Sequence, residues 1–480
     1  MNFTKGLGQH SKLAGLAGWL LTAFALFWFI RLPGMFEPDR LFHLSVLREM
    51  QSQGTLVLRT WSQLPLLGWD QYFSDKEFLY HVLSYPLWRI FSETGYLAST
   101  ALISSAVFWL PYFFLRTSRL KVVLVCAALI LSSQYLIYRM NLPRPHILGV
   151  LCLEGFFLSL LGKRALPAAL FGLAFSLAYH ALYLPAALGG LVLADGIIRQ
   201  QRATWRVGLA ALFGLMVGIL VNPYFPSNIF RSLQGLALGM NLSHLPEYIR
   251  ARIGRELIPF TSLQYATILL PTVLLGGWSA WKLRRHRDYF PYFLFLAILW
   301  IGAIRTPRTV EFAAPLTAVI IALSWQKKSR PTAITLGLIF VWNAAFTISN
   351  GAYFFKPDGS QPPIAAYESF LKLIPAKATP TMVFHDRWDY ASFAIYLRPD
   401  IQVPEVLDPT FLWMQNPGQA ELMGVLWRGG VERSGDALRE VFRADYAIVE
   451  RPLAYRLSKD PRATMIADIK KGELTLYRLR

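Results

Sequence analysis

Long apolar stretches recur through the first 350 residues, and they constrain the fold more than any other feature of the sequence. They lie at about 13–32, 97–115, 121–138, 146–162, 165–179, 181–197, 207–222, 263–281, 289–304, 308–325 and 331–350. A helix that crosses a bilayer needs roughly twenty apolar residues. The composition, 54% hydrophobic and 16% charged, is that of a polytopic membrane protein. We therefore predict a mainly α fold, a membrane helical bundle of about eleven spans.

Basic residues mark one side of this predicted bundle. The residues before the first span and every second connection are basic: Lys5 and Lys12; Arg116, Arg119 and Lys121; Lys163 and Arg164; Arg199, Arg202 and Arg206; Lys282, Arg284, Arg285 and Arg287; Lys327, Lys328 and Arg330. Cytoplasmic loops carry an excess of Lys and Arg, so the N-terminus is predicted to be cytoplasmic. The alternation requires two helices that meet at Tyr179-His180, where one long broken helix is the alternative.

The composition changes near residue 351, where prolines and charges appear. Strand patterns at 381–384, 401–406, 446–449 and 473–479 and helix patterns at 388–397 and 437–442 follow. We predict a transmembrane domain at 1–350 and a small extracytoplasmic α/β domain at 351–480. Two long outer loops, 33–96 and 223–262, belong to the first domain. Segments 42–51 and 79–91 are expected to be amphipathic helices along the membrane interface.

Some classes of function are excluded. Both cysteines, Cys126 and Cys152, lie in apolar stretches and cannot form a disulfide framework or a Cys-based zinc site. The net charge of +19 is spread over short patches, with no long basic stripe. Nucleic acid is therefore not an expected partner.

Two carboxylate clusters follow the first span closely. Glu37-Pro38-Asp39 comes directly after it, and Asp75-Lys76-Glu77 comes about 35 residues later. A loop that only connects two spans has little need for clustered carboxylates so near the lipid. An enzyme that takes a proton from an acceptor and handles a phosphate does need them.

Several short motifs resemble those of the C-type (GT-C) membrane glycosyltransferases. This superfamily includes protein O-mannosyltransferases, the aminoarabinose transferase of lipid A and, more distantly, oligosaccharyltransferases. The motifs are the two carboxylate clusters, Gly54-Thr55-Leu56, Arg144-Pro145-His146, Tyr179-His180, Asn222-Pro223-Tyr224, Arg305-Thr306-Pro307-Arg308, Trp388-Asp389-Tyr390 and Leu407-Asp408-Pro409. Two motifs depart from the family pattern. Asp75-Lys76-Glu77-Phe78 replaces Asp-Lys-Pro-Pro, and Arg387-Trp388-Asp389-Tyr390-Ala391 only partly matches Trp-Trp-Asp-Tyr-Gly.

The resemblance implies sugar transfer with inversion from a polyprenyl-phosphate donor to a lipid, glycan or protein acceptor on the extracytoplasmic face. It also implies a bacterial inner (plasma) membrane location. Such chemistry needs a carboxylate base and cations for the leaving phosphate. Asp39 is the leading candidate for the general base, because low-dielectric surroundings at the end of the first span can raise a carboxylate pKa. The other candidate catalytic carboxylates are Glu37 and Asp75.

Cations that are predicted to bind the donor phosphate lie at outer helix ends. Guanidinium groups match phosphate oxygens in bidentate geometry, and a lysine acts as a point charge. The candidates are Arg305, Arg308, Lys76 and Arg144. Residues predicted to bind acceptor or substrate are Glu77, His43, His81, His180, Trp388 and Asp389. We expect the carboxylates and the arginines to converge on one cavity open to lipid.

Each of these residues also has a structural alternative. Asp39 could pair with Arg40 or Arg48, Arg305 and Arg308 could anchor helices to headgroups, and Trp388 could pack in the α/β core. The metal requirement stays open: if a divalent ion such as Mg or Mn takes part, Asp39 and Asp75 would supply oxygen ligands. Two other functions also remain, a transporter or flippase of a lipid-linked sugar and a noncatalytic envelope scaffold. A transporter should show related halves, which the sequence lacks.

Overall fold

The computed structural model describes residues 9–35, 37–115, 119–131, 134–240, 245–254, 259, 261, 270–324, 341, 364–377, 379–469 and 474–480. The chain divides into two compact units. Unit 1 comprises Met1–Phe36, Lys76–Met240 and Glu256–Lys356. Unit 2 comprises Glu37–Asp75, Asn241–Arg255 and Pro357–Arg480. Both units are therefore assembled from segments that are far apart in the sequence.

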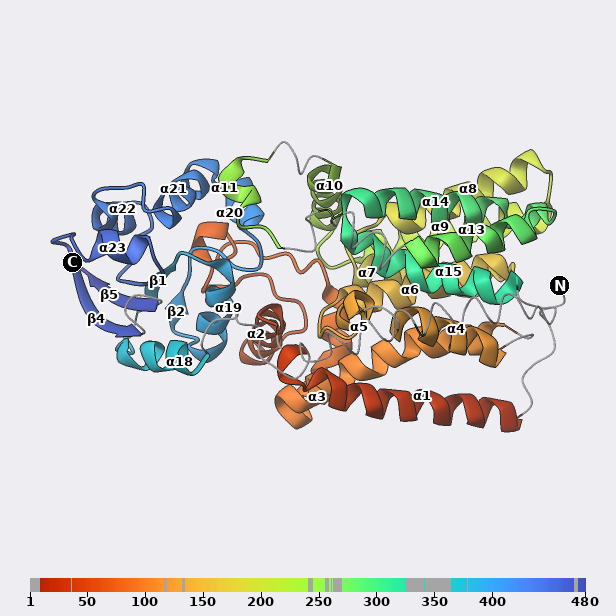
Figure 1. Ribbon diagram of the computed structural model, residues 1–480, viewed down its shortest axis with the longest axis horizontal. Helices are drawn as coiled ribbons and strands as arrows, with labels where there is room; N and C mark the ends of the chain where they lie inside the picture. Colours follow the sequence, from red (N-terminus) through yellow and green to blue (C-terminus); the bar gives the residue numbers. More distant parts are fainter. Residues whose placement is uncertain are drawn as a thin grey trace. The chain divides into compact units, whose positions relative to one another are not determined.

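Unit 1 is a bundle of helices that run roughly along one another (Figure 1). Its described helices are α1 (Gln9–Ile30), α3 (Phe78–Phe114), α4 (Arg119–Leu131), α5 (Gln134–Met140), α6 (His146–Leu161), α7 (Ala165–Ala178), α8 (Tyr183–Ile198), α9 (Arg202–Val221), α10 (Ser227–Met240), α13 (Leu270–Leu283), α14 (Phe290–Arg305) and α15 (Val310–Ser324). Short 3-10 turns lie at η1 (Pro33–Met35), η6 (Arg287–Tyr289) and η7 (Pro307–Thr309).

The predicted spans correspond closely to these helices. Five described helices are long and apolar enough to cross a membrane, and α6, α7 and α8 are shorter apolar helices. The stretch 121–138 forms two helices, α4 and α5, where one span was predicted. The chain leaves helical geometry between α7 and α8, so the prediction of two helices around His180 is confirmed. The predicted last span, 331–350, lies outside the described residues apart from residue 341.

Outward-facing side chains of unit 1 suit a lipid environment. Helix α1 exposes Leu21, Phe24 and Trp28, which are spaced to lie on one helical face. Its other side packs on α3, where Gly18 lies against the ring of Trp109 and Trp109 Nε1 donates to Thr22 Oγ1 at 2.9 Å. An apolar face turned away from the protein is what a membrane-spanning helix requires.

Small residues bring α7 and α9 close together. Gly214 and Gly218 lie one turn apart on α9, and a Cβ at Gly214 would lie 2.0 Å from the carbonyl oxygen of Ala169 on α7. A Cβ at Gly218 would meet Ser176 at the same distance. Small residues spaced by four are the usual means of close helix approach in membranes, where packing replaces the hydrophobic effect.

The two ends of the bundle gather different loops. At one end Asp288 lies 2.8 Å from Arg199 and 3.7 Å from Lys163, which joins three connections that the charge pattern placed on the cytoplasmic side. Arg199 follows the end of α8, whereas His180 and its neighbour Glu77 lie near the start of that helix. Loops on opposite ends of the bundle are what a chain that crosses the membrane back and forth would have. The identity of the cytoplasmic end remains a prediction.

Unit 2 is an α/β domain with a five-stranded sheet in the order β2-β1-β3-β5-β4. Its strands are β1 (Thr381–His385), β2 (Ile401–Gln402), β3 (Tyr446–Val449), β4 (Ala463–Ile469) and β5 (Leu474–Leu479). Strand β1 pairs in parallel with β2 and β3, and β5 pairs antiparallel with β3 and β4. The covering helices are α18 (Ile364–Leu373), α19 (Trp388–Leu397), α20 (Pro409–Gln415), α21 (Pro417–Trp427), α22 (Ser434–Glu440) and α23 (Leu453–Leu457). Figure 1 shows α18 and α19 on one side of the sheet and α21, α22 and α23 on the other.

Two segments from the predicted outer loops complete unit 2. They carry α2 (Asp39–Ser52) and η2 (Pro65–Leu67) in the first segment and α11 (Glu247–Arg250) in the second. The aromatic rings of Trp61 and Trp69 stack in the first segment, with Phe42 and Phe73 against them. The compact units thus differ from the sequence-based division at residue 350, because buried contacts tie these loops to the C-terminal residues.

Most predicted elements of the α/β domain are present. The helix at 388–397 and the strand at 446–449 are found as predicted, and the other three strands and the helix near 437–442 are found with shifted bounds. The strand at 401–406 ends at Gln402, because Val403 donates its N–H to Gln63 and Pro404 has none to give. The sequence analysis missed β4, an exposed edge strand whose alternation is broken by a bulge at Met465/Ala467.

Candidate functional site

The predicted site residues fall into both compact units. Lys76, Glu77, His81, Arg144, His180, Arg305 and Arg308 belong to unit 1. Glu37, Asp39, His43, Asp75, Trp388 and Asp389 belong to unit 2. The arrangement of each group follows from the elements of its own unit.

A polar cluster in unit 1 lies around the break between α7 and α8. Lys76 Nζ lies 3.5 Å from Glu77 Oε1, and the same oxygen lies 3.8 Å from His180 Nδ1. The His180 ring packs on that of Tyr179, with centroids 4.4 Å apart. Glu77 is buried, whereas Lys76 and His180 are partly exposed. The structure therefore brings together three of the predicted residues.

Arg308 belongs to the same cluster. Burial, together with the positive charges of Lys76 and Arg308, holds the pKa of His180 well below its ordinary value. His180 is then neutral at physiological pH and can donate or accept a hydrogen bond without adding charge. Arg308 lies in η7, three residues after Arg305, and is half-buried, whereas Arg305 ends α14 and is exposed. Two cations and one carboxylate thus surround a neutral imidazole.

Behind this cluster lies an ion pair that the sequence analysis did not predict. Arg139 Nε lies 2.5 Å from Glu311 Oε1, and both side chains are buried. His146 Nε2 lies 2.7 Å from the carbonyl oxygen of Arg139 and 3.7 Å from Glu311 Oε2. Glu311 is the second residue of α15, which follows η7, the turn that carries Arg308. The available signal in the sequence was a carboxylate inside the apolar stretch 308–325.

The other unit 1 candidates are more deeply enclosed. Arg144 is buried, and its backbone N–H donates to Leu142 O at 2.7 Å in the turn before α6. His81 is fully buried near the start of α3, beside the ring of Tyr80. These positions suit residues that support the polar cluster or the packing of the bundle.

In unit 2, Asp39 is the first residue of α2. Glu37 and Asp39 are both buried, with 6% and 8% of their surface exposed. His43 is also buried, one turn along α2, with its ring against Phe42. Asp75 is buried at the other end of the same segment of unit 2.

No metal centre is evident in the described part of the chain. Among those residues, no three His, Cys, Asp or Glu side chains gather in a way that could hold a metal ion. The possible metal requirement, with Asp39 and Asp75 as oxygen ligands, therefore stays a prediction.

Trp388 and Asp389 begin α19, just after the carboxyl end of β1. Trp388 Nε1 donates to Arg252 O at 2.7 Å, so this side chain ties the 241–255 segment to the domain. The Asp389 carboxylate accepts from the guanidinium of Arg387 through both oxygens. Arg387 also contacts Glu450, after β3. Trp388 and Asp389, two of the residues predicted to bind acceptor or substrate, thus have defined partners within unit 2.

Buried charges continue around these strand ends. Arg252 pairs with Glu405, and both are almost fully enclosed. Asp386 accepts the N–H of Glu450 at 2.8 Å. Burial, reinforced by the nearby charge of Glu450, raises the pKa of Asp386 to about 7. The carboxyl ends of β1 and β3 therefore carry a polar network that the sequence analysis recognised only at Trp388 and Asp389.

Comparison with known proteins finds a likeness of fold. No family model matches the chain, and neither does any curated protein sequence. The fold is similar to the crystal structure of ArnT from Cupriavidus metallidurans in the apo state, with a TM-score of 0.57 and 12% sequence identity. The match covers 97% of this chain and 98% of that chain. The chain therefore shares the fold of that structure over nearly its whole length.

Proposed function

We propose that this chain is an integral membrane glycosyltransferase that transfers a sugar from a polyprenyl-phosphate donor to a lipid, glycan or protein acceptor. The observation that carries the proposal is the likeness to ArnT, which extends over both the helical unit and the α/β unit. A likeness limited to the membrane helices would be weaker support, because helical bundles serve many functions. The motif resemblance in the sequence adds to it independently.

In the proposed reaction the acceptor hydroxyl oxygen attacks the anomeric carbon of the donor sugar. The bond between that carbon and the phosphate oxygen breaks, and polyprenyl phosphate leaves with the electron pair. Asp39 takes the hydroxyl proton, with Glu37 or Asp75 as the alternative base. One displacement inverts the anomeric configuration.

Cations stabilise the leaving phosphate in this proposal. Arg308 and Lys76 are supported by their shared position around His180, which places two positive charges near one another. Arg305 and Arg144 are further candidates. A guanidinium that meets a phosphate in two parallel hydrogen bonds stabilises developing negative charge more strongly than a neutral donor does. Glu77, His43, His81, His180, Trp388 and Asp389 are proposed to position the donor or acceptor.

We further propose that the reaction takes place on the extracytoplasmic face of a bacterial inner membrane. The basic loops support a cytoplasmic N-terminus. The 351–480 domain then lies on the extracytoplasmic side.

The test is transfer of radiolabelled sugar in membranes that contain the chain, across a panel of polyprenyl-phosphate sugars. Asp39→Asn should reduce transfer by at least about a hundredfold, because it removes the proton acceptor. Asp70→Asn is the matched control, since Asp70 is an exposed carboxylate of the same segment. It should transfer at the wild-type rate.

The alternatives give different results. A flippase would move the labelled lipid across vesicle membranes without forming a new glycosidic bond. A noncatalytic scaffold would show no transfer with any donor of the panel. Wild-type transfer in the Asp39→Asn chain would remove Asp39 as the base.

A further inference from the structure

The helix that begins with Asp39 is held at its far end by the C-terminal domain. Arg48 lies nine residues after Asp39 on α2, roughly 13 Å along the helix axis. Every residue between them except Arg40 is buried, so this part of α2 is enclosed by its neighbours. Whatever fixes the position of Arg48 therefore limits the position and rotation of the whole helix.

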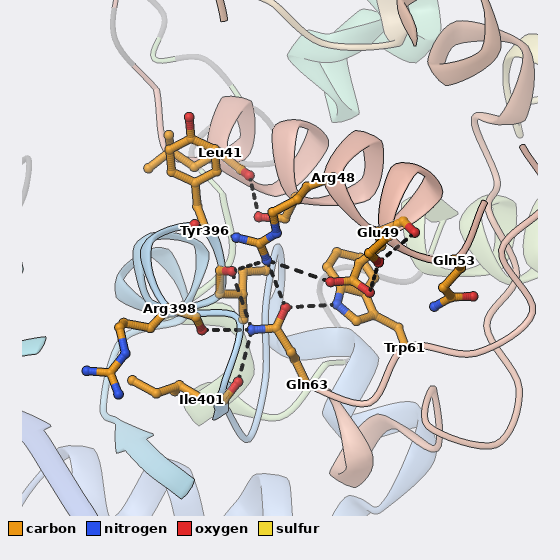
Figure 2. A network of polar contacts seen from close by, with 12 residues as sticks. Leu41, Arg48, Glu49, Gln53, Trp61, Gln63, Tyr396, Arg398 and Ile401 are labelled. Atoms are coloured by element: carbon orange, nitrogen blue, oxygen red, sulfur yellow. Dashed lines mark hydrogen bonds and ion pairs between the residues drawn. The ribbon is translucent and has the colours of Figure 1, made fainter. Parts of the chain in front are cut away.

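Arg48 binds the last turn of α19. Its Nη1 donates to Tyr396 O at 2.5 Å and its Nη2 to Ile395 O at 2.6 Å (Figure 2). Carbonyls in the last turn of a helix have no partner within the helix, and the partial negative charge there favours a cation. Burial lowers the pKa of Arg48, but an arginine remains charged. These two hydrogen bonds join parts of the chain that are far apart: Tyr396 lies 348 positions after Arg48, and Ile395 lies 347 positions after it.

Gln63 makes a second connection beside the first. Its Nε2 reaches the carbonyl oxygens of Ile395, Arg398 and Ile401 at 3.0–3.3 Å. Its Oε1 accepts from Arg48 Nη2 and from Trp61 Nε1, both at 3.2 Å. Figure 2 shows Gln63 between Arg48 and the turn that follows α19. The Gln63 side chain is almost fully buried, so each of these groups would be costly to leave without a partner.

Backbone and exposed contacts extend the same junction. The backbone N–H of Val403, directly after β2, donates to Gln63 O at 2.9 Å and so links the end of that strand to the 37–75 segment. Gln402 Nε2 donates to Ser62 O at 2.9 Å at the exposed rim. Arg48 and Gln63 are therefore the buried centre of a junction that joins one helix end, one turn and one strand. We refer to this pair as the α2 clasp.

We infer that the α2 clasp, Arg48 and Gln63, is a positioning device that holds α2 on the C-terminal domain and thereby sets the location of the Asp39 carboxylate. The inference rests on the proposed function for the role of Asp39. It gives the C-terminal domain a part in the reaction that does not depend on its touching substrate. A misplacement of about 1 Å at a reacting group can cost about a hundredfold in rate, so a clasp distant from Asp39 can still govern turnover.

The decisive variant is Arg48→Lys in the full-length chain. Lysine keeps the charge and the aliphatic stem but replaces the planar fork by a point charge, which cannot serve two carbonyls and Gln63 Oε1 together. Arg439→Lys is the matched control. Arg439, in α22, also donates to a backbone carbonyl, Ala444 O, at 3.0 Å, and it pairs with Asp445, so its printed partners are not those of Arg48 or Gln63.

Two readouts are measured for each variant. Hydrogen exchange of the α2 backbone should quicken at least about tenfold in Arg48→Lys and stay unchanged in Arg439→Lys, where the turn before β3 should respond instead. In the transfer assay, Arg48→Lys should lower kcat about tenfold or more, with the donor KM within about twofold of wild type. Gln63→Met, which keeps the side-chain volume, should act in the same direction.

Each outcome decides the inference. Unchanged α2 exchange in Arg48→Lys overturns it, as does an equal fall in kcat for Arg439→Lys, which would mark a general loss of domain stability. If Asp39→Asn retains full transfer, the proposed base fails. The exchange readout then still decides whether the clasp holds α2, so the two failures are distinguishable.

Discussion

Arg139 and Glu311 form a buried ion pair between the end of α5 and the first turn of α15, with Nε 2.5 Å from Oε1. His146, at the start of α6, lies against the same carboxylate. Three helices of unit 1 therefore meet at one charged junction. Glu311 follows the turn that carries Arg308, so the junction also holds the backbone of Arg308, which is proposed to bind the donor phosphate.

Breaking this ion pair should destabilise unit 1 strongly. Glu311→Gln leaves Arg139 charged and enclosed, and the loss of one buried partner costs about 3–5 kcal/mol. The measurement is thermal unfolding of the detergent-solubilised chain. The control is Asp288→Asn, which breaks an exposed pair with Arg199 in the same unit and should cost at most about 1 kcal/mol. Equal losses in the two variants would contradict a buried, structure-fixing role for Glu311.

Arg308 should matter more for the donor than for stability. Arg308→Ala should raise the donor KM or lower kcat by about tenfold or more, because a hydrogen bond to a charged group contributes about 1.5–3 kcal/mol. Arg308→Lys should recover part of the loss, since lysine keeps the charge without the fork. The comparison variant is Arg285→Ala, an exposed arginine between α13 and α14. Unchanged kinetics in Arg308→Ala would leave Arg308 a structural role only.

Close packing of α7 on α9 gives a prediction about glycine. Gly214→Ala should destabilise unit 1 by about 1–3 kcal/mol, because the added methyl meets the backbone of Ala169 and the helices must separate. Gly190→Ala, in α8, adds its methyl to open space and should be neutral or slightly stabilising. Thermal unfolding in detergent compares the two. A neutral Gly214→Ala would show that the helices tolerate a wider separation.

Asp386 should make the stability of unit 2 depend on pH. Its pKa in the folded chain is about 7, above the ordinary value for an aspartate of about 4. The folded state therefore binds an additional proton between these values, and this contribution to stability is lost as the pH rises from about 4 to 7. The groups that set this pKa are Glu450, which raises it, and Arg252 and Arg387, which lower it.

The measurement is the melting temperature between pH 5 and pH 8 for wild type and for Asp386→Asn. The difference between the two chains should change with pH in favour of the variant as the pH rises. His385 acts in the opposite sense, because burial lowers its pKa to about 3 and its contribution is lost as the pH falls below about 6.5. Comparing the chains removes that term, since both contain His385. A difference that is constant with pH would contradict the raised pKa.

The predicted elements that were found share a local signal. The spans are apolar runs of sufficient length, and the 388–397 helix and the strands near 381–384 and 446–449 have clear periodicity or β-branched residues. The helix at 42–51 was also predicted, and the structure extends it to Asp39–Ser52. Motifs singled out Lys76, Glu77, His180 and Arg308, which the structure brings into one cluster.

The missed features lack such a signal. Nothing near Arg139 in the sequence indicates that its partner is Glu311, and nothing near Arg252 indicates Glu405. Strand β4 is exposed and irregular, so alternation did not reveal it. The membership of 37–75 in unit 2 depends on Arg48 and Gln63, whose partners lie more than 300 residues away.

Local patterns in the sequence were enough to predict the membrane bundle, the α/β character of the C-terminal residues and most candidate site residues. These predictions follow from the length of apolar runs, from periodicity and from short motifs, all of which act over a few neighbouring residues. The folded chain was needed to see which segments share a unit, which charges pair in the interior and how α2 is held. Those choices depend on contacts between distant residues, where burial makes each hydrogen bond and ion pair specific and where no local pattern identifies the partner.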